Sequence, residues 1–220
     1  MAGFLPVVPA HAGGWVQAKG EAYLRLAAAY EDHEGFYARR TDAYGEWGVT
    51  PDWTVSGKIE TVDFSTSNVF DSTGYRITAR RRLWTPGQWS FTGEAGFLEG
   101  AAIGGFRGCE NFGGEWNFGV GRSGQLKSGT YFAAATLGQR AHSGNCQTNR
   151  AEAVIGLVRP SGWTTTFQYW AEEGDAGRSE KVEFMTSVRL GKIELGSATR
   201  TEISGEFEET AFVLSLALRL

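Results

Sequence analysis

The sequence predicts an all-β protein, a twelve-stranded antiparallel up-and-down transmembrane β-barrel. Three observations predict it: alternating residues at the C-terminus, short turns that alternate with longer loops, and tryptophans gathered near the proposed short turns. Strict alternation of apolar and polar residues is typical of a strand with one face in an apolar medium. No run of about 18 apolar residues occurs, which excludes a membrane-spanning helix.

The C-terminal strand shows the alternation most clearly. From residue 210 onward, one set of alternate residues is almost wholly apolar and the other is small or polar, ending in Arg219. The apolar set is Thr210, Phe212, Leu214, Leu216, Leu218 and Leu220. This strand resembles the closing strand of bacterial outer-membrane barrels, although that family usually ends in Phe or Trp and this chain ends in Leu220.

Alternation and turn residues together predict the remaining strands. Short turns such as Pro51-Asp52 favour tight reversals, and longer polar loops separate one hairpin from the next. Strands of roughly ten residues are long enough to cross the hydrocarbon layer when tilted. Bacterial barrels have even strand numbers and short periplasmic turns, so both chain ends are expected on the periplasmic side. The predicted strands are 19–30, 39–50, 53–64, 75–84, 89–98, 111–121, 130–140, 148–158, 163–172, 179–190, 193–200 and 206–220.

Tryptophan positions give an independent indication. Six of the 8 tryptophans lie near the mature N-terminus or beside the proposed short turns, and so near one rim. Indole rings prefer the headgroup level of a membrane, whereas a soluble β-sandwich buries large rings in the middle of its strands. We therefore expect an aromatic girdle of Trp15, Trp47, Trp53, Trp84, Trp89 and Trp163.

The N-terminus and the cysteines indicate export. Residues 1–12 are apolar and end in Ala10-His11-Ala12, which fits the A-x-A cleavage site of a secretory signal. We expect a signal-peptide remnant over residues 1–12 and a single barrel domain over residues 13–220. The only two cysteines, Cys109 and Cys146, fall in successive outer loops, so they are expected to form a disulfide.

Charged residues of the predicted strands are expected to face the lumen, because a basic side chain facing lipid at midplane costs roughly 2–4 kcal/mol. Arg81 would face outward, which only a place near the rim or a bulge makes tolerable. The predicted pore-lining residues are Arg25, Arg40, Asp42, Glu46, Lys58, Glu60, Arg76, Arg80, Arg82, Glu94, Glu115, Arg150, Glu152, Lys181, Glu183 and Arg189.

Two interpretations of this lumen remain open. In the first, it is a narrow water-filled pore in which Arg76, Arg80 and Arg82 form a basic ladder that guides anionic solutes. In the second, acids and bases pair and close the interior. Small barrels are filled by side chains, whereas those with about 16 or more strands leave a channel, and twelve strands fall between.

Other chemistry has weaker support in the sequence. A net charge of −4 suggests no nucleic-acid partner, and no Cys/His group has the spacing of a metal site, so neither metal nor cofactor is expected. Gly119, Gly121 and Gly124 spell G-x-G-x-x-G, but a turn and a strand follow where a dinucleotide site needs a helix. His142 and Ser143 are residue types of a hydrolase triad, yet neighbours in a loop rarely reach triad geometry, so no catalytic residue is assigned.

The first third of the chain is similar to uncharacterised small outer-membrane β-barrel proteins of Gram-negative bacteria. Those proteins open with Gly-x-Trp, followed by a Tyr-x-Glu-Tyr/Trp-Gly-Leu/Val-Thr hairpin. The matching residues here are Gly14, Trp15, Lys19 and Gly20, then Tyr44, Glu46, Trp47, Gly48, Val49, Thr50, Pro51 and Asp52. The resemblance implies a fold and an outer-membrane location, but no activity and no oligomeric state. It implies outer-membrane lipids and lipopolysaccharide as surroundings, and the barrel-assembly machinery as the partner of the C-terminal strand.

The sequence therefore favours a narrow, passive, porin-like channel for small hydrophilic solutes. A barrel plugged by salt bridges, with a structural or surface-interaction role, is the first alternative. An outer-membrane enzyme that modifies lipid or lipopolysaccharide is the second.

Overall fold

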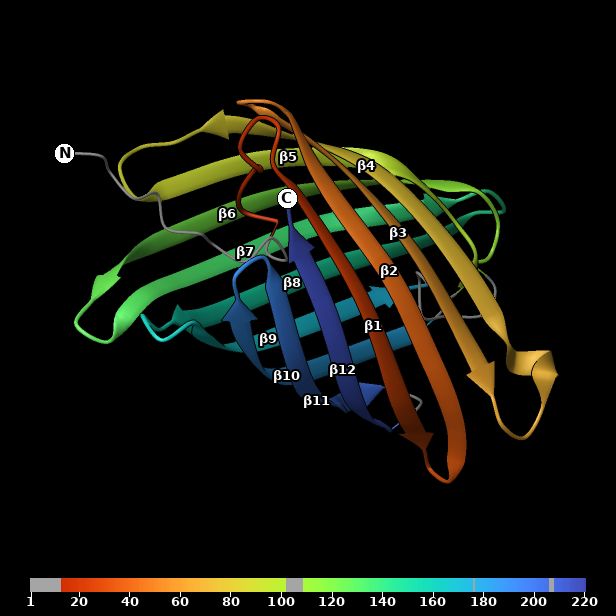
Figure 1. The fold of residues 1–220 in the computed structure, drawn as a ribbon. Helices are drawn as coiled ribbons and strands as arrows, with labels where there is room; N and C mark the ends of the chain where they lie inside the picture. The colour runs from red at the N-terminus through yellow and green to blue at the C-terminus, as the bar shows by residue number, and fades with distance from the viewer. Residues whose placement is uncertain (1–12, 102–108, 176, 206–207) are drawn as a thin grey trace.

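The computed structural model describes residues 13–101, 109–175, 177–205 and 208–220. They form a closed barrel of twelve antiparallel strands, which confirms the predicted fold class (Figure 1). No helix in these ranges is long and apolar enough to cross a membrane. The elements are β1 (Ala22–His33), β2 (Phe36–Thr50), β3 (Trp53–Phe64), the 3-10 turn η1 (Asn68–Phe70), β4 (Ser72–Trp84), β5 (Trp89–Glu99), β6 (Gly113–Leu126), β7 (Gly129–His142), β8 (Cys146–Val158), β9 (Trp163–Gly174), β10 (Gly177–Leu190), β11 (Ile193–Gly205) and β12 (Glu209–Arg219).

Every strand pairs with its neighbours in sequence, and β12 closes the barrel against β1. The closing register runs from Tyr23 opposite Arg219 to His33 opposite Glu209. At its end, the backbone N–H of Ala22 donates to the Leu220 carbonyl and the N–H of Leu220 donates back, both over 2.9 Å. The sheet therefore has no free edge at this seam.

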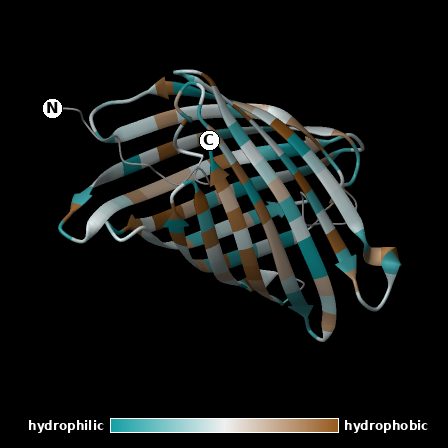
Figure 2. Ribbon diagram, viewed as in Figure 1, coloured by the Kyte–Doolittle hydropathy of each residue, from teal (hydrophilic) through white to brown (hydrophobic). Residues whose placement is uncertain are grey.

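The polarity of the barrel is the reverse of that of a soluble protein. Large apolar side chains point outward, as shown by Leu26 and Ile77 at 60% exposure and Leu137 at 62%, while carboxylates such as Glu31 are fully buried. Apolar and polar residues succeed one another along the strands (Figure 2). The C-terminal strand follows its prediction: Leu214 faces outward and Ala217 is buried. This inversion is what a barrel in an apolar medium needs, and it excludes the apolar core of a β-sandwich.

The two ends of the barrel differ. At one end, which we call the short-turn end, tight turns join β2 to β3, β4 to β5, β6 to β7, β8 to β9 and β10 to β11. The opposite end, which we call the long-loop end, carries the connection between β5 and β6, of which residues 102–108 lie outside the described residues. The expected alternation of short turns and longer loops does not hold at every connection there, because only residues 143–145 join β7 to β8. The predicted loop over 31–38 is wrong, however, because β1 runs to His33, β2 resumes at Phe36, and only Glu34 and Gly35 turn the chain, both at positive φ (52° and 91°). Charged residues there read as loop in the sequence but are inward-facing strand residues such as Glu31.

Candidate functional site: the barrel interior

The barrel encloses a cavity of about 290 Å³ whose wall carries more cations than anions. The nine basic side chains are Arg25, Arg40, Lys58, Arg76, Arg80, Arg140, Arg150, Lys181 and Arg200, and the six acidic ones are Asp42, Glu60, Glu94, Glu152, Glu172 and Glu183. Twelve of the residues predicted to line a pore are among these fifteen. Four further carboxylates, Glu31, Glu46, Glu115 and Glu209, lie behind the wall and pair with these cations, so the excess of three basic side chains belongs to the lining and not to the interior as a whole.

Carboxylates behind this wall pair with its cations. Around the β1–β12 seam, Glu31 accepts from Arg40 at 2.5 Å and from Arg200 at 2.6 Å, and Glu209 accepts from Lys181 at 2.5 Å and from Arg200 at 2.6 Å. Both carboxyl side chains have at most 1% exposure. Glu60 extends this seam network through Arg40 and Lys58. Six strands, β10 to β12 and β1 to β3, are thereby joined across their inner faces.

A second network occupies the opposite wall, on β4 and β6 to β9. Glu115 lies 3.6 Å from Arg76, 3.1 Å from Arg140 and 3.7 Å from Arg150. Glu172 accepts from Arg150 at 2.6 Å and lies 3.3 Å from Arg140. Arg150 also binds Glu152 at 2.5 Å, so three carboxylates and three guanidinium groups pair on this wall.

The predicted basic ladder is not a row of equivalent cations. Arg76 and Arg80 line the cavity, and Arg80 is bound to Glu94 at 2.5 Å and to Glu46 at 3.1 Å. Arg82 instead lies at the short-turn rim, 3.7 Å from Asp52, with 37% of its side chain exposed. Its placement in the lumen is therefore a correction to the sequence interpretation.

Three other predicted charges also lie off the cavity wall. Glu46 and Glu115 are buried in the ion-pair networks behind it. Arg189 is near the short-turn end, where its backbone N–H donates to the Gly162 carbonyl at 3.0 Å. Arg81 does face outward, and it stands at the rim with its guanidinium 5.5 Å from the Trp53 ring centre.

Sequence reasoning missed five charged residues of the two networks: Glu31, Arg140, Glu172, Arg200 and Glu209. Four of them lie at or beyond the predicted end of a strand, and Glu209 lies near the predicted start of the last strand, all toward the long-loop end. Continued through the charged residues, the alternation places Glu31 on the same inward face as Arg25 and Ala27. The alternation could therefore have identified these residues as parts of strands, although charged residues at a strand end more often indicate a loop.

Residues 13–20, which we call the N-terminal strap, lie inside the short-turn end of the barrel. Their backbone is fastened to the inner wall: Thr92 donates to the Gly13 carbonyl at 2.5 Å and Arg80 donates to the Trp15 carbonyl at 2.9 Å. The Gln17 backbone N–H donates to Thr54 at 2.8 Å, and the Gln17 side chain donates to Glu46 at 2.8 Å. Gly13 also lines the cavity, so the strap forms part of its floor.

Glycines on the inner wall make room for this strap. A methyl group on Gly119 would lie 2.4 Å from the Gly13 carbonyl oxygen, and one on Gly121 would lie 2.6 Å from the Trp15 ring. A methyl group on Gly48 would lie 2.0 Å from the Ala18 carbonyl oxygen. Two glycines of the G-x-G-x-x-G sequence are thus explained by close packing.

Trp15 corrects the predicted girdle. Its ring lies inside the barrel, edge-on to Phe132 with 6.5 Å between the ring centres. Phe132 is 1% exposed and also lines the cavity, so the two rings narrow the short-turn end together. The other five predicted girdle residues point outward at this end, with exposures of 40–63%: Trp47, Trp53, Trp84, Trp89 and Trp163.

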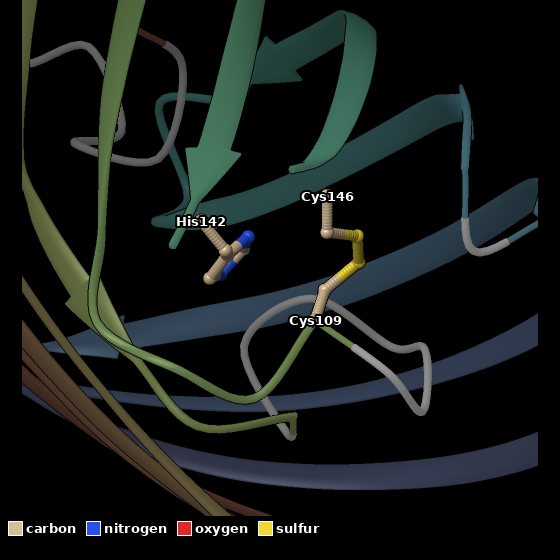
Figure 3. A group of neighbouring side chains, drawn as sticks. All are labelled: Cys109, His142 and Cys146. Carbon is tan, nitrogen blue, oxygen red and sulfur yellow. A yellow bond between two sulfur atoms is a disulfide. The ribbon is translucent and has the colours of Figure 1, made fainter. Parts of the chain in front are cut away.

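The predicted disulfide between Cys109 and Cys146 is present, with 5.6 Å between the Cα atoms. His142 lies beside it at the long-loop end (Figure 3). Both ring nitrogens of His142 are buried without a hydrogen-bond partner, so the hydroxyl of Ser143 does not bond to it as a hydrolase triad requires. The predicted signal remnant, residues 1–12, lies outside the described residues.

Comparison with known proteins identifies the fold. No family model and no curated protein matches the chain. Among solved structures, it is similar to the NanC porin, with a TM-score of 0.66, 9% identity, and coverage of 90% of this chain and 100% of that one. The KdgM porin is similar with a TM-score of 0.62 and 9% identity, over 88% of this chain and 98% of that one. An outer membrane channel from Pseudomonas putida F1 is similar with a TM-score of 0.61 and 9% identity, over 97% of this chain and 100% of that one. The chain therefore has the fold of outer-membrane channel barrels.

Proposed function

We propose that this protein is a narrow passive channel of the bacterial outer membrane for small anionic solutes. The observation that carries the proposal is the cavity inside the barrel, whose wall has nine basic against six acidic side chains. At about 290 Å³ the cavity is near the lower end of ligand-sized cavities, roughly 300–1,000 Å³. Fixed cations in a low-dielectric passage raise the local concentration of anions and exclude cations.

The surroundings follow from the same proposal. The outward tryptophans at the short-turn end would lie at the headgroup level of a bilayer, with outer-membrane lipid and lipopolysaccharide around the barrel. The short-turn end and both chain ends would face the periplasm. The alternating C-terminal strand would engage the barrel-assembly machinery, and residues 1–12 would be what remains of an export signal.

Conductance across a planar bilayer tests the channel and its charge selectivity. We expect the refolded chain to give reproducible unitary steps, with a reversal potential in a salt gradient that indicates a preference for anions. Arg76→Gln and Lys58→Gln each remove a cation from the cavity wall, so each should shift the reversal potential toward cation preference. Arg122→Gln is the matched control, because Arg122 faces outward over the Trp89 ring at 5.1 Å.

The N-terminal strap favours a second candidate, a barrel closed at its short-turn end. Four hydrogen bonds hold the strap across the interior, and Trp15 with Phe132 narrows what remains. In this case the wild-type protein would be silent in the bilayer although folded, as judged by heat-modifiable gel migration. Its role would then be structural or at the cell surface.

One pair of variants separates the two candidates. Gly121→Ala puts a methyl group 2.6 Å from the Trp15 ring, so the strap must move. Gly114→Ala adds the same methyl group to the same strand, where the nearest atom is 3.6 Å away. If the strap limits passage, Gly121→Ala should raise conductance and Gly114→Ala should not. Conductance that is absent from the wild type and both variants would contradict the channel proposal.

A further inference from the structure

Three potential metal ligands meet at the long-loop end, outside the charged cavity. His142 ends β7 and Cys146 begins β8, and the two face each other across a three-residue turn as partners in the strand register. Cys109 reaches them from the segment before β6, on the other side of β7 (Figure 3). His142 and Cys146 are thus three intervening residues apart on one hairpin, and Cys109 joins them only through the fold, which is why spacing along the sequence did not indicate a metal site.

The group is compact and closed to solvent. Its three ligand atoms, the two sulfur atoms and a ring nitrogen, all lie within 4.8 Å of one another. Exposure is 2% for Cys109, 6% for His142 and 8% for Cys146. Neither ring nitrogen of His142 has a hydrogen-bond partner, although leaving a buried polar group without one destabilises a fold. A buried imidazole in this state indicates a partner that the disulfide form does not provide.

We propose that reduction of the Cys109–Cys146 disulfide converts this group into a binding site for a thiophilic metal ion of the Zn²⁺ type, with His142 as the third ligand. A phosphine donates two electrons that break the S–S bond and takes up the oxygen atom of a water molecule, whose two protons complete the two thiols, so the products are two thiols and a phosphine oxide. Metal binding then releases both protons as the thiolates form. The three protein ligands leave a fourth tetrahedral position for water.

The present geometry needs little adjustment for this. Zinc binds sulfur at about 2.3 Å and imidazole nitrogen at about 2.0–2.1 Å, so ligand atoms around it lie roughly 3–4 Å apart. The spread of up to 4.8 Å found here is close to that arrangement. Since the sulfur atoms cannot be bonded to each other and act as two thiolates at once, disulfide and metal site are mutually exclusive states of the same residues.

A second group of potential metal ligands is a weaker candidate for a metal site. Glu31, His33 and Glu209 also place their ligand atoms within 4.8 Å of one another. The two carboxylates, however, already bind Arg40 and Arg200. The guanidinium groups of these two arginines occupy the carboxylate oxygens of Glu31 and Glu209, and their positive charge repels a divalent cation.

Cobalt(II) titration of the full-length, refolded protein in detergent tests the proposal. The protein is reduced with a phosphine, freed of reductant under argon, and checked for folding by heat-modifiable gel migration. We expect one equivalent of cobalt to give thiolate-to-metal charge-transfer bands and intense visible d–d bands, and Zn²⁺ to displace it. The oxidised protein should give neither. His142→Ala should weaken binding by at least about tenfold to a hundredfold, the loss seen when even an outer-shell partner is removed.

Matched controls make the assignment specific. His33→Ala changes a histidine of the other grouping and should leave the titration unchanged, whereas Cys109→Ser combined with Cys146→Ser should abolish it. The proposal is overturned if the reduced, folded protein binds cobalt no better than the oxidised form. Equal affinity of His142→Ala and wild type also overturns it, and so does a barrel that loses its fold on reduction, because the site depends on the β7–β8 hairpin.

Discussion

Glu115 is the carboxylate around which one wall of the interior is organised. Its side chain has no solvent exposure and lies within 3.7 Å of the guanidinium groups of Arg76, Arg140 and Arg150. A buried charge is tolerated only when it is paired, and removing one partner leaves the others uncompensated. The negative charge of Glu115 therefore permits three arginines to share one wall.

Glu115→Gln should destabilise the folded barrel by about 3 kcal/mol, because three buried cations lose a shared partner. Denaturant titration of the protein in liposomes, followed by tryptophan fluorescence, measures the change. Glu180→Gln is the control: its ion-pair partner Arg178 is 59% exposed, so solvent screens the pair, and the glutamine carbonyl can still accept the hydrogen bond that the Tyr169 hydroxyl donates at 2.7 Å. No measurable change is therefore expected. Equal stability of the two variants would show that the pairing around Glu115 contributes nothing.

At the scale of strands and segments, inward glycines determine what fits inside the barrel. Gly119 and Gly121 on β6 accommodate the N-terminal strap, and Gly156 on β8 accommodates the Phe132 ring. Phe132 in turn meets Trp15 edge-on. A strand glycine often marks such a close approach, and here three of them shape the narrow end of the cavity.

Gly156→Ala tests this packing. Its methyl group would lie 2.2 Å from the Phe132 ring, so overpacking should cost roughly 1–3 kcal/mol. In a Phe132→Ala background the same substitution should cost much less, because the ring is gone and only the Thr166 methyl group, 2.9 Å away, still crowds the new Cβ atom. The double-mutant cycle, measured as free energies of unfolding, should therefore give a large coupling. Additive effects would mean that Gly156 is not required by Phe132.

The strap also marks a limit of sequence reasoning at this scale. Alternation predicts which strand residues point inward, and Lys58 and Glu60 of β3 do line the cavity as predicted. It says nothing about a segment that does not alternate, so Trp15 was assigned to the rim by its position alone. Its hydrogen bonds to Thr92 and Arg80, together with the close approach of Gly119 and Gly121, place the segment inside the barrel.

For the molecule as a whole, the inverted polarity predicts a depth-dependent response to outward charge. Leu137 is 62% exposed in the middle of β7, and Leu126 is 55% exposed at the short-turn end of β6. In a bilayer, Leu137→Arg should cost roughly 2–4 kcal/mol and Leu126→Arg roughly 0–1 kcal/mol. Unfolding from liposomes measures both values. Similar costs at the two positions would contradict a bilayer centred on the strands.

The overall architecture was predictable because it depends on a repeating rule. Twelve alternating segments with turns between them define an antiparallel barrel, and the outward position of Leu214 and Leu216 follows from it. The interior was less predictable, because pairing depends on register and on side-chain reach. Glu46 and Arg80 face the same lumen in either interpretation, but only the coordinates place them 3.1 Å apart.

The ion pair between Arg200 and Glu31, across the β1–β12 seam, bears on the rate at which the barrel unfolds. Arg200 on β11 reaches past β12 to Glu31 on β1, at 2.6 Å and across 169 positions of sequence. Such a contact forms only when the last strand has met the first, so it is absent while the sheet is still open. Interactions missing from the folding transition state slow unfolding and leave the folding rate nearly unchanged. The pair should therefore act as a kinetic latch, and Arg200→Gln should shorten the lifetime of the closed barrel in denaturant without slowing its assembly.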